Sequence, residues 1–213
     1  MRWTVLIPAK ALPAAKSRLA ATSTDAGEHA RLVGALRADT IAAARATAQV
    51  ARVVLIVDRE DAAPADAVVL VQIAPGLNAA VRQGAEQAAR DWPDDGIAAL
   101  VGDLPALRPD ELAAALDAAA RIPRGFVADH TGVGTTMLTA VPGQSLEPLF
   151  GADSAVRHAR SATPLPAGPG LRWDVDTLDD LRGALEIGVG PATLAAAVAS
   201  STAGTAGVYP GGR

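Results

Sequence analysis

Cysteine is absent from this chain of 213 residues, and its absence removes several kinds of chemistry at once. Without a thiol the protein cannot build a disulfide framework, bind zinc through cysteine or attack a substrate with a thiolate. Any catalysis must therefore use other side chains. The absence of cysteine leaves the redox compartment open, but the cytosol fits, and we expect the protein in the cytoplasm.

Long hydrophobic runs are also absent. No uninterrupted apolar stretch approaches the roughly 20 residues that a membrane-spanning helix needs, because Arg and Asp interrupt even the alanine-rich segments. Residues 1–7 are basic and then apolar, but Pro8 and Lys10 follow too early for the core of a signal peptide. We interpret this opening as a first strand and expect a soluble protein with no membrane partner.

A net positive charge is lacking as well. The formal net charge is -4, so the chain lacks the general basic field that binds nucleic acid polymers. Half of the residues are hydrophobic and 20% are charged, which is typical of a folded globule. A chain of this length can form one α/β domain with a sizeable core.

Several familiar site motifs are missing too. The sequence has no G-x-G-x-x-G, no P-loop pattern and no G-x-S-x-G nucleophile motif. Its three histidines, His29, His130 and His158, form no metal-binding cluster in sequence. We expect His29 on the surface of a helix. His130 and His158 fall beside the second anion site described below, with a solvated position as the alternative.

The hydrophobic pattern predicts the fold. Short runs rich in Val, Ile and Leu alternate with stretches of helical periodicity, which is typical of βαβ units in a mostly parallel sheet with helices on both faces. Strands are expected at residues 4–8, 52–57, 68–73, 97–101, 125–129, 135–141 and 171–175. Helices are expected at 28–47, from Asn78, from Pro109, at 154–162 and 178–187, and from Pro191.

Some of these elements carry more specific predictions. The continuous apolar run 68–73 indicates a strand covered on both faces. Asn78 is expected to be the N-cap of the next helix, and Thr177 with Asp180 predicts a capping box. One domain should span residues 1–199. Residues 200–213 have little apolar surface, and we expect a disordered tail there.

The loop after the first strand concentrates positive charge. The chain has 17 Arg but only two Lys, and both of them, Lys10 and Lys16, lie in this loop together with Arg18. In doubly wound sheets the carboxyl end of a strand is where phosphates bind. These three cations could therefore neutralise a triphosphate. The alternative is an ordinary solvated basic loop.

Two acidic positions suggest a magnesium site. Asp103 follows the strand at 97–101 in the stretch Gly-Asp-Leu-Pro. Its carboxylate is therefore expected at the carboxyl end of a strand, where ligands bind in such sheets. Asp174 and Asp176 lie at the end of the strand expected at 171–175, so strand alternation points both to one side. Mg²⁺ is usually held by one or two carboxylates, and one of this pair could face Asp103. The alternative is that Asp103 only caps the following turn.

A second anion pocket is predicted where two small-residue loops meet. Residues 129–136 form a loop rich in Gly and Thr, and Gly151 and Ser154 precede and open a helix. Small residues and helix N-termini let backbone N–H groups approach an anion. The alternative is that both are ordinary turns, because Gly, Thr and Ser are common turn and cap residues.

Taken together, these motifs resemble a known family, the 2-phospho-L-lactate or phosphoenolpyruvate guanylyltransferases of deazaflavin coenzyme biosynthesis. The resemblance covers residues 1 to about 187 in order. It is carried by Ile-Pro-Ala-Lys at 7–10, Lys-Ser-Arg-Leu at 16–19, Gly-Leu-Asn at 76–78, Gly-Asp-Leu-Pro at 102–105, Gly-Thr-Thr at 134–136, Gly151, Ser154, His158 and Asp-Val-Asp-Thr at 174–177.

The resemblance implies a single-domain, Rossmann-like nucleotidyltransferase fold, GTP as donor and a phosphorylated three-carbon acid as acceptor. It further implies Mg²⁺ at Asp103 and Asp176 as the cofactor. The acceptor would be bound by Thr136, Gly151 and Ser154. The nucleotide would be bound by Lys10, Lys16, Asn78 and Gly102, and the catalytic residues would be Lys10, Lys16, Arg18 and Asp103.

The implied reaction needs no catalytic base. A phosphomonoester has a second pKa of about 6, so the acceptor phosphate is already largely a dianion at neutral pH. Its oxygen could attack the α-phosphorus of GTP directly, while Lys10, Lys16 and Arg18 stabilise the departing pyrophosphate. The small number of histidines is therefore compatible with this reaction.

Other functions stay open on the sequence alone. One is nucleotide transfer to a molybdenum-cofactor or sugar-phosphate acceptor, although the glycine-rich first loop usual there is missing. Another is a non-catalytic nucleotide-binding module, which would not require a pair of magnesium-binding carboxylates. The sequence does not distinguish phosphoenolpyruvate, 2-phospho-L-lactate and 3-phosphoglycerate as acceptors, and it leaves a homo-oligomer possible.

Overall fold

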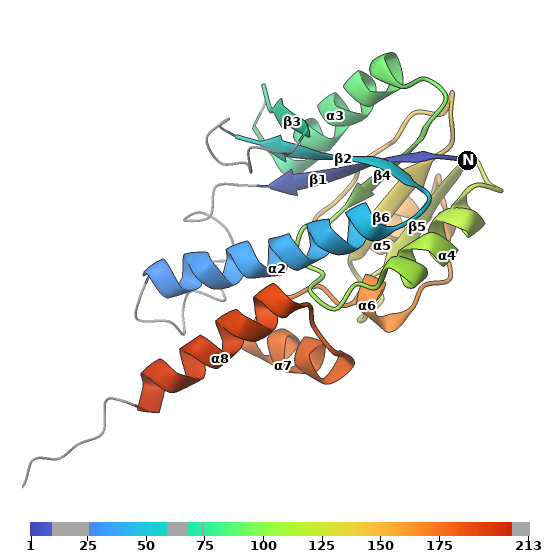
Figure 1. Cartoon of the computed structure of the whole chain (residues 1–213). Helices are drawn as coiled ribbons and strands as arrows, with labels where there is room; N and C mark the ends of the chain where they lie inside the picture. Colours follow the sequence, from blue (N-terminus) through green and yellow to red (C-terminus); the bar gives the residue numbers. More distant parts are fainter. Residues whose placement is uncertain (10–25, 59–67, 74, 206–213) are drawn as a thin grey trace, which may run out of the picture.

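A computed structural model describes residues 1–9, 26–58, 68–73 and 75–205 of the chain (Figure 1). Its centre is a seven-stranded sheet in the order β3-β2-β1-β4-β6-β5-β7. The strands are β1 Trp3–Ala9, β2 Val50–Val57, β3 Val68–Val71, β4 Gly96–Leu100, β5 Arg124–Ala128, β6 Thr135–Ala140 and β7 Thr163–Pro164. The predicted α/β fold with a mostly parallel sheet is confirmed.

Helices cover both faces of the sheet. They are α2 Ala26–Ala46, α3 Leu77–Asp91, α4 Pro109–Ala119, α5 Ser154–His158, α6 Pro169–Arg172, α7 Leu178–Ile187 and α8 Pro191–Thr205. Side chains of α2, α4 and α6 share one apolar cluster with the sheet, and side chains of α3 and α5 share another. Helices α7 and α8 pack with α2 in a third cluster outside the sheet (Figure 1).

Strand alternation explains how one sheet supports two cores. In β1, Val5 and Ile7 belong to the cluster under α2 and α4, whereas Leu6 between them belongs to the cluster under α3. All three are fully buried. Residues of opposite parity point to opposite faces of a strand, so an uninterrupted apolar run is what a sheet covered on both faces requires.

Strand β6 runs against its neighbours and thereby defines one edge of the sheet. It is antiparallel to β4 and β5, while β1 pairs in parallel with β2 and β4. Consequently the carboxyl ends of β1, β2, β4 and β5 lie at the same edge as the amino end of β6. We call this the carboxyl edge. In doubly wound sheets, ligands bind at this edge, where the strand order reverses.

Two expected strands differ from the structure. The run 68–73 is not covered on both faces, because β3 is the outer strand of the described sheet and Val68 and Val71 are 45% and 42% exposed. The expected strand 171–175 is wrong: α6 ends at Arg172 and an irregular segment follows. Pro169 at the first position of α6 favours a helical turn, and a short apolar run does not distinguish the two states by period alone.

Three helical features also differ from expectation. Helix α5 ends at His158 rather than at residue 162. Helix α8 continues to Thr205, beyond the expected domain boundary at residue 199. His29 is buried rather than on the surface, since α2 packs against α8 as well as against the sheet. The capping box of Thr177 and Asp180 is confirmed.

No helix in the described ranges is both long enough and apolar enough to cross a membrane.

Candidate active site

The carboxyl edge brings together most of the predicted site residues that the structure describes. Asp103 follows β4, residues 129–134 connect β5 to β6, and Thr136 lies at the start of β6. Two later segments join them, at 149–154 and 173–176. Lys10, Lys16 and Arg18 fall outside the described residues, and their roles stay predictions.

Asp103 is held in a rigid turn. The N–H of the next residue, Leu104, donates to Thr40 Oγ1 at 2.9 Å, and Gly190 N–H donates to the carbonyl of Pro105 at 2.9 Å. Gly102 permits the tight passage of this turn over β1, because a Cβ there would lie 3.2 Å from Ile7 Cγ2. The acidic side chain is thus presented from a fixed backbone.

One hydrogen bond joins Asp103 to the second acidic segment. The N–H of Val175 donates to the carbonyl of Asp103 at 3.1 Å, which places Asp174 and Asp176 on either side of that contact. Asp174 is half-buried and Asp176 is exposed. The predicted meeting of the two segments is therefore observed, but it does not arise from strand alternation, since residues 173–176 are not a strand.

Side chains from α6 and the following segment hold residues 173–176 against the end of β5. The guanidinium of Arg172 donates from Nε to Ala128 O at 3.2 Å and from Nη2 to Asp129 O at 2.8 Å. The ring of Trp173 stacks on His130 with centroids 4.1 Å apart, and its Nε1–H donates to Asp180 O at 2.8 Å. His130 thus contributes a packing surface for the acidic segment.

Arg37 adds a cation to this region that the sequence pattern did not single out. Burial lowers the pKa of Arg37, and the nearby carboxylates of Asp103 and Asp58 partly offset this effect. Arg37 comes from a helix, Asp58 follows β2 and Asp103 follows β4. Only the packed fold places Arg37 beside these carboxylates.

The glycine loop at 129–134 is closed by its own aspartate. The carboxylate of Asp129 accepts from Val133 N at 3.0 Å, from Gly134 N at 2.8 Å and from Thr131 Oγ1 at 2.8 Å. The N–H of Gly132 donates to the Asp129 carbonyl at 3.1 Å. These N–H groups are therefore not open to an external anion, contrary to the role predicted for them.

Thr136 and Ser154 are brought into the same region, but both are buried. Thr136 is fully buried, and its Oγ1 has no hydrogen-bond partner among the described residues. Its carbonyl accepts from Val101 N at 2.9 Å, two residues before Asp103. Ser154 is 2% exposed and follows Gly151, which has a φ of 117°. Only Gly adopts that φ without strain.

His158 is a structural residue in the described fold. Its Nδ1 lies 2.9 Å from Thr135 Oγ1, and its Nε2 accepts from Leu149 N at 2.9 Å. Because Nε2 accepts, Nδ1 carries the proton of the neutral ring and donates to Thr135. Burial lowers the pKa of His158 to about 4, with a further contribution from the charge of Arg157. The solvated alternative for this residue is wrong.

Asn78 does not cap α3. The helix begins at Leu77 with Gly76 as its N-cap, and no side chain caps it. The amide of Asn78 instead binds the backbone of Phe150 twice, donating to its carbonyl at 3.0 Å and accepting from its N–H at 2.8 Å. Asn78 thereby fixes the segment that carries Gly151 to the start of α3.

Comparison with known proteins identifies the family. The sequence profile described as "Guanylyl transferase CofC like" matches residues 3–165. A phosphoenolpyruvate guanylyltransferase of Streptomyces coelicolor is 48% identical over 212 residues, which cover 96% of this chain and 100% of that protein. One of Geodermatophilus obscurus is 47% identical over 204 residues, with 91% and 93% covered. The chain belongs to the CofC-like guanylyl transferase family.

Solved structures show that this family member shares its fold with other nucleotidyltransferases. A 2-C-methyl-D-erythritol 4-phosphate cytidylyltransferase from Thermus thermophilus superposes with a TM-score of 0.53 at 19% identity, covering 88% of this chain and 98% of that one. A nucleotidyl transferase from Methanothermobacter gives a TM-score of 0.55 at 14% identity, covering 87% and 97%. At such identities the similarity shows the fold alone.

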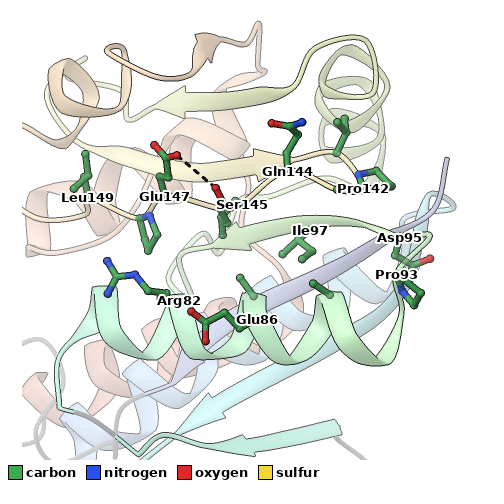
Figure 2. Close-up of a pocket in the computed structure, with 16 residues that line it drawn as sticks. Arg82, Glu86, Pro93, Asp95, Ile97, Pro142, Gln144, Ser145, Glu147 and Leu149 are labelled. Carbon is green, nitrogen blue, oxygen red and sulfur yellow. Dashed lines mark hydrogen bonds between the residues drawn. The ribbon is translucent and has the colours of Figure 1, made fainter.

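A cavity of about 720 Å³ lies apart from the predicted residues of this guanylyl transferase family member (Figure 2). It runs between α3 and the segment that follows β6, and its lining includes Arg82, Glu86, Ile97, Ser145 and Glu147. None of the predicted donor, acceptor or metal residues lines it. The predicted site is therefore the carboxyl edge and not this cavity.

Proposed function

We propose that this CofC-like family member transfers GMP from GTP to the phosphate of phosphoenolpyruvate and releases pyrophosphate. The names of its relatives support the substrates, at 48% identity over nearly the whole chain. The structural observation that carries the proposal is the hydrogen bond from Val175 to Asp103, which joins two acidic segments at the carboxyl edge. A phosphorylated acid of related shape, 2-phospho-L-lactate, is the nearest alternative acceptor.

The donor would lie at the junction of β1 and β4. Lys10 follows directly on the last residue of β1 in sequence, and Lys16 and Arg18 come later in the same connection. Gly102 and Asp103 follow β4. Cations on the β- and γ-phosphates would stabilise the negative charge that grows on departing pyrophosphate. Asn78 would act indirectly on the nucleotide, because both polar ends of its amide bind Phe150.

The acceptor phosphate would approach from the side of β6. Thr136 lies on that strand, adjacent to Val101, and its buried hydroxyl, which has no hydrogen-bond partner among the described residues, is the group that we assign to the phosphate. An oxygen of the acceptor phosphate would form the new bond to the α-phosphorus of GTP. The bond between the α-phosphorus and the oxygen that bridges to the β-phosphate would break, and its electron pair would leave with pyrophosphate. As the phosphate is largely dianionic at neutral pH, no side chain needs to remove a proton.

The acidic residues present suit a magnesium ion. Asp103 and Asp176 offer hard oxygen donors on adjacent segments, and Mg²⁺ commonly uses one or two carboxylates together with waters and substrate phosphates. Within the described ranges, no group of three or more His, Asp or Glu is placed to hold a metal ion by itself, so substrate oxygens would complete the coordination. When bound, the ion would neutralise phosphate charge.

A pyrophosphate-release screen tests the proposal. The four nucleoside triphosphates would each be combined with phosphoenolpyruvate, 2-phospho-L-lactate, 3-phosphoglycerate and a sugar 1-phosphate, in the presence and absence of Mg²⁺. We expect turnover with GTP and phosphoenolpyruvate only when Mg²⁺ is present. Phosphorus NMR should show the new diphosphate linkage in the product.

Other outcomes of the screen would contradict the proposal. Turnover with a sugar 1-phosphate alone would assign a different acceptor, and turnover with CTP alone would assign a different donor. GTP binding without pyrophosphate release from any pair would indicate a non-catalytic module. The cytoplasm stays the proposed location, since both proposed substrates are small soluble phosphates.

A further inference from the structure

Helix α2 directs a cation toward the carboxyl edge. The helix begins on the side of this edge and runs back along the sheet, antiparallel to β1 (Figure 1). Side chains of an α-helix point toward its amino end, so a long side chain of α2 reaches toward the edge. Arg37 is such a side chain, and it is half-buried.

Two contacts place Arg37 beside the turn that carries Asp103. Thr40, three residues along on the same side of the helix, accepts a hydrogen bond from Leu104 N–H at 2.9 Å. A Cβ on Gly102 would lie 4.0 Å from Cγ of Arg37, so the aliphatic part of the arginine lies beside the residue before Asp103. The guanidinium is at the far end of that stem, and it extends beyond Gly102.

Carboxylates on both sides of β1 act on this guanidinium. Asp103 follows β4 and Asp58 follows β2, and these two strands flank β1 in the sheet. The charges of both carboxylates stabilise the cationic form of Arg37. Arg37 is therefore placed as a counter-ion of Asp103, with Asp58 as a second carboxylate nearby.

A counter-ion at this position opposes the metal role proposed for Asp103. A carboxylate that binds Mg²⁺ must offer an oxygen to the ion, whereas a neighbouring guanidinium competes for that oxygen and repels a divalent cation. The phosphates of a bound nucleotide would reduce this opposition, because they attract both cations.

We propose that Arg37 competes with the divalent metal for Asp103 until a nucleoside triphosphate is bound, and so favours binding of the metal together with GTP. This inference rests on the proposed function and on the metal role of Asp103 within it. It assigns Arg37 to the order in which metal and donor bind, and not to the chemical step.

Binding of Mn²⁺ to the protein without nucleotide tests the proposal. Electron paramagnetic resonance measures free Mn²⁺ directly, so the readout does not depend on turnover. We expect Arg37→Gln to lower the Kd for Mn²⁺ by about tenfold, comparable in size to the effects of other groups that contact metal ligands. A variant that only disturbs the fold would bind the metal more weakly. Arg37→Lys keeps the positive charge and should gain less affinity than Arg37→Gln.

A matched control removes the same charge elsewhere on α2. Arg45 is exposed in the last turn of the helix, about 12 Å farther from the edge by the rise of an α-helix. Arg45→Gln should leave the Kd for Mn²⁺ unchanged. Arg37→Met keeps an aliphatic stem beside Gly102 and takes the place of Arg37→Gln if that variant does not fold.

A double replacement shows whether the effect acts through the proposed metal ligand. In an Asp103→Asn background, Arg37→Gln should no longer improve Mn²⁺ binding, because the carboxylate for which the two cations compete is gone. The same gain with and without Asp103 would mean that Arg37 repels the metal from some other position.

A GTP analogue with a methylene bridge between the α- and β-phosphates tests the nucleotide part of the proposal. With this analogue bound, the wild-type protein and Arg37→Gln should differ less than about threefold in their Kd for Mn²⁺, because phosphate oxygens then supply part of the coordination. An equal gain with and without the analogue would show that the nucleotide does not relieve the competition.

The outcomes separate this inference from the proposed function. If the wild-type protein releases no pyrophosphate from GTP with any acceptor, the proposed function fails, whatever the Mn²⁺ titrations show. If it transfers GMP but Arg37→Gln binds Mn²⁺ no more tightly than the wild-type protein, Arg37 does not compete with the metal. A gain in affinity that depends on Asp103 and shrinks with the analogue supports the inference.

Discussion

Asp103 is the residue whose surroundings are best defined at the carboxyl edge. Its turn is fixed by Thr40 and Gly190, its carbonyl binds Val175, and the charge of Arg37 lies nearby. This environment holds a carboxylate in position without a large cluster of acids. The proposed role of Asp103 is therefore to present one oxygen ligand from a rigid backbone, with Asp176 on the adjacent segment.

The proposed metal role can be tested by neutral replacements. Asp103→Asn and Asp176→Asn should each lower kcat by at least about 100-fold, because a ligand to a charge-neutralising ion is lost. The melting temperature should change by only a few degrees. Asp179→Asn, on the exposed first turn of α7, is the control. Near-normal Mg²⁺-dependent turnover in both site variants would show that other groups hold the metal.

His158 gives a prediction about pH and stability. The pKa of this residue is about 4 in the fold and 6.5 in the unfolded chain, so the neutral form is favoured by folding. Its contribution to stability is complete above pH 6.5 and is lost as the pH falls from there toward 4. The lost stability is about 3 kcal/mol, from a difference of about 2.5 pK units.

Chemical unfolding at several pH values measures this effect. The His158→Gln variant should be less stable than the wild-type protein at pH 7.5, and its stability should fall less steeply between pH 6.5 and 4.5. His29→Gln is a control at another buried histidine. Equal slopes for the wild-type protein and His158→Gln would mean that protonation of His158 is not coupled to unfolding.

Among the elements, the segment 173–176 is the one whose position depends most on side-chain contacts. It has no regular secondary structure and is held by Arg172, by the stack of Trp173 on His130 and by the hydrogen bond to Asp103. A Cβ on Gly183 would lie 2.1 Å from the Trp173 ring, so the indole also packs closely on α7. Trp173 is therefore a positioning residue for the acidic segment.

Removing the Trp173 ring should weaken metal binding more than nucleotide binding. We expect Trp173→Ala to raise the Mg²⁺ concentration for half-maximal activity by about tenfold, equivalent to about 1.4 kcal/mol. Trp173→Phe should restore most of the effect because it keeps a stacking surface. Equilibrium binding of Mn²⁺ provides a readout independent of turnover. Trp92→Ala is the control, since Trp92 packs on Arg52 at the opposite edge of the sheet.

Most elements could be predicted from the sequence, because hydrophobic periodicity and cap residues act locally. Helix α7 has the predicted bounds, and its capping box is present. The failures have different causes. Residues 171 and 172 end a helix because Pro169 favours a helical turn there, and β3 is exposed because no further described strand lies beside it.

The candidate site was predictable only in part. The rule that ligands bind at strand carboxyl ends places Asp103 correctly at that edge. No local pattern indicates that the carboxylate of Asp129 fills the glycine loop, since this depends on side-chain conformation. Lys10, Lys16 and Arg18 stay predictions from charge and chain position.

At the scale of the whole molecule, α8 ties the end of the described chain to α2. Asp39 on α2 accepts from Ala192 N at 3.1 Å and from Thr193 N at 2.7 Å, which satisfies the first turn of α8. Gly190 packs closely on the same carboxylate. The last helix is therefore coupled to a helix that covers the central sheet, as expected for one folding unit.

This coupling predicts how the protein unfolds. Asp39→Ala should lower stability by about 1 to 2 kcal/mol, the usual cost of losing a helix cap. The transition should stay single, with circular dichroism and tryptophan fluorescence giving coincident curves. Asp110→Ala, in the first turn of α4, is a control at another helix start. A separate early transition in the variant would show that α8 unfolds as an independent unit.

The hydrogen bond between Val175 and Asp103 has a consequence for protein synthesis. The two residues are about 70 positions apart, so at about 5 to 20 residues per second the ribosome adds the second about 4 to 14 seconds after the first. A nascent chain can pair β1, β2 and β4 before residues 173–176 exist. The two halves of the proposed acidic site therefore meet only late in translation, and we expect no nucleotide transfer from a chain arrested before that segment emerges.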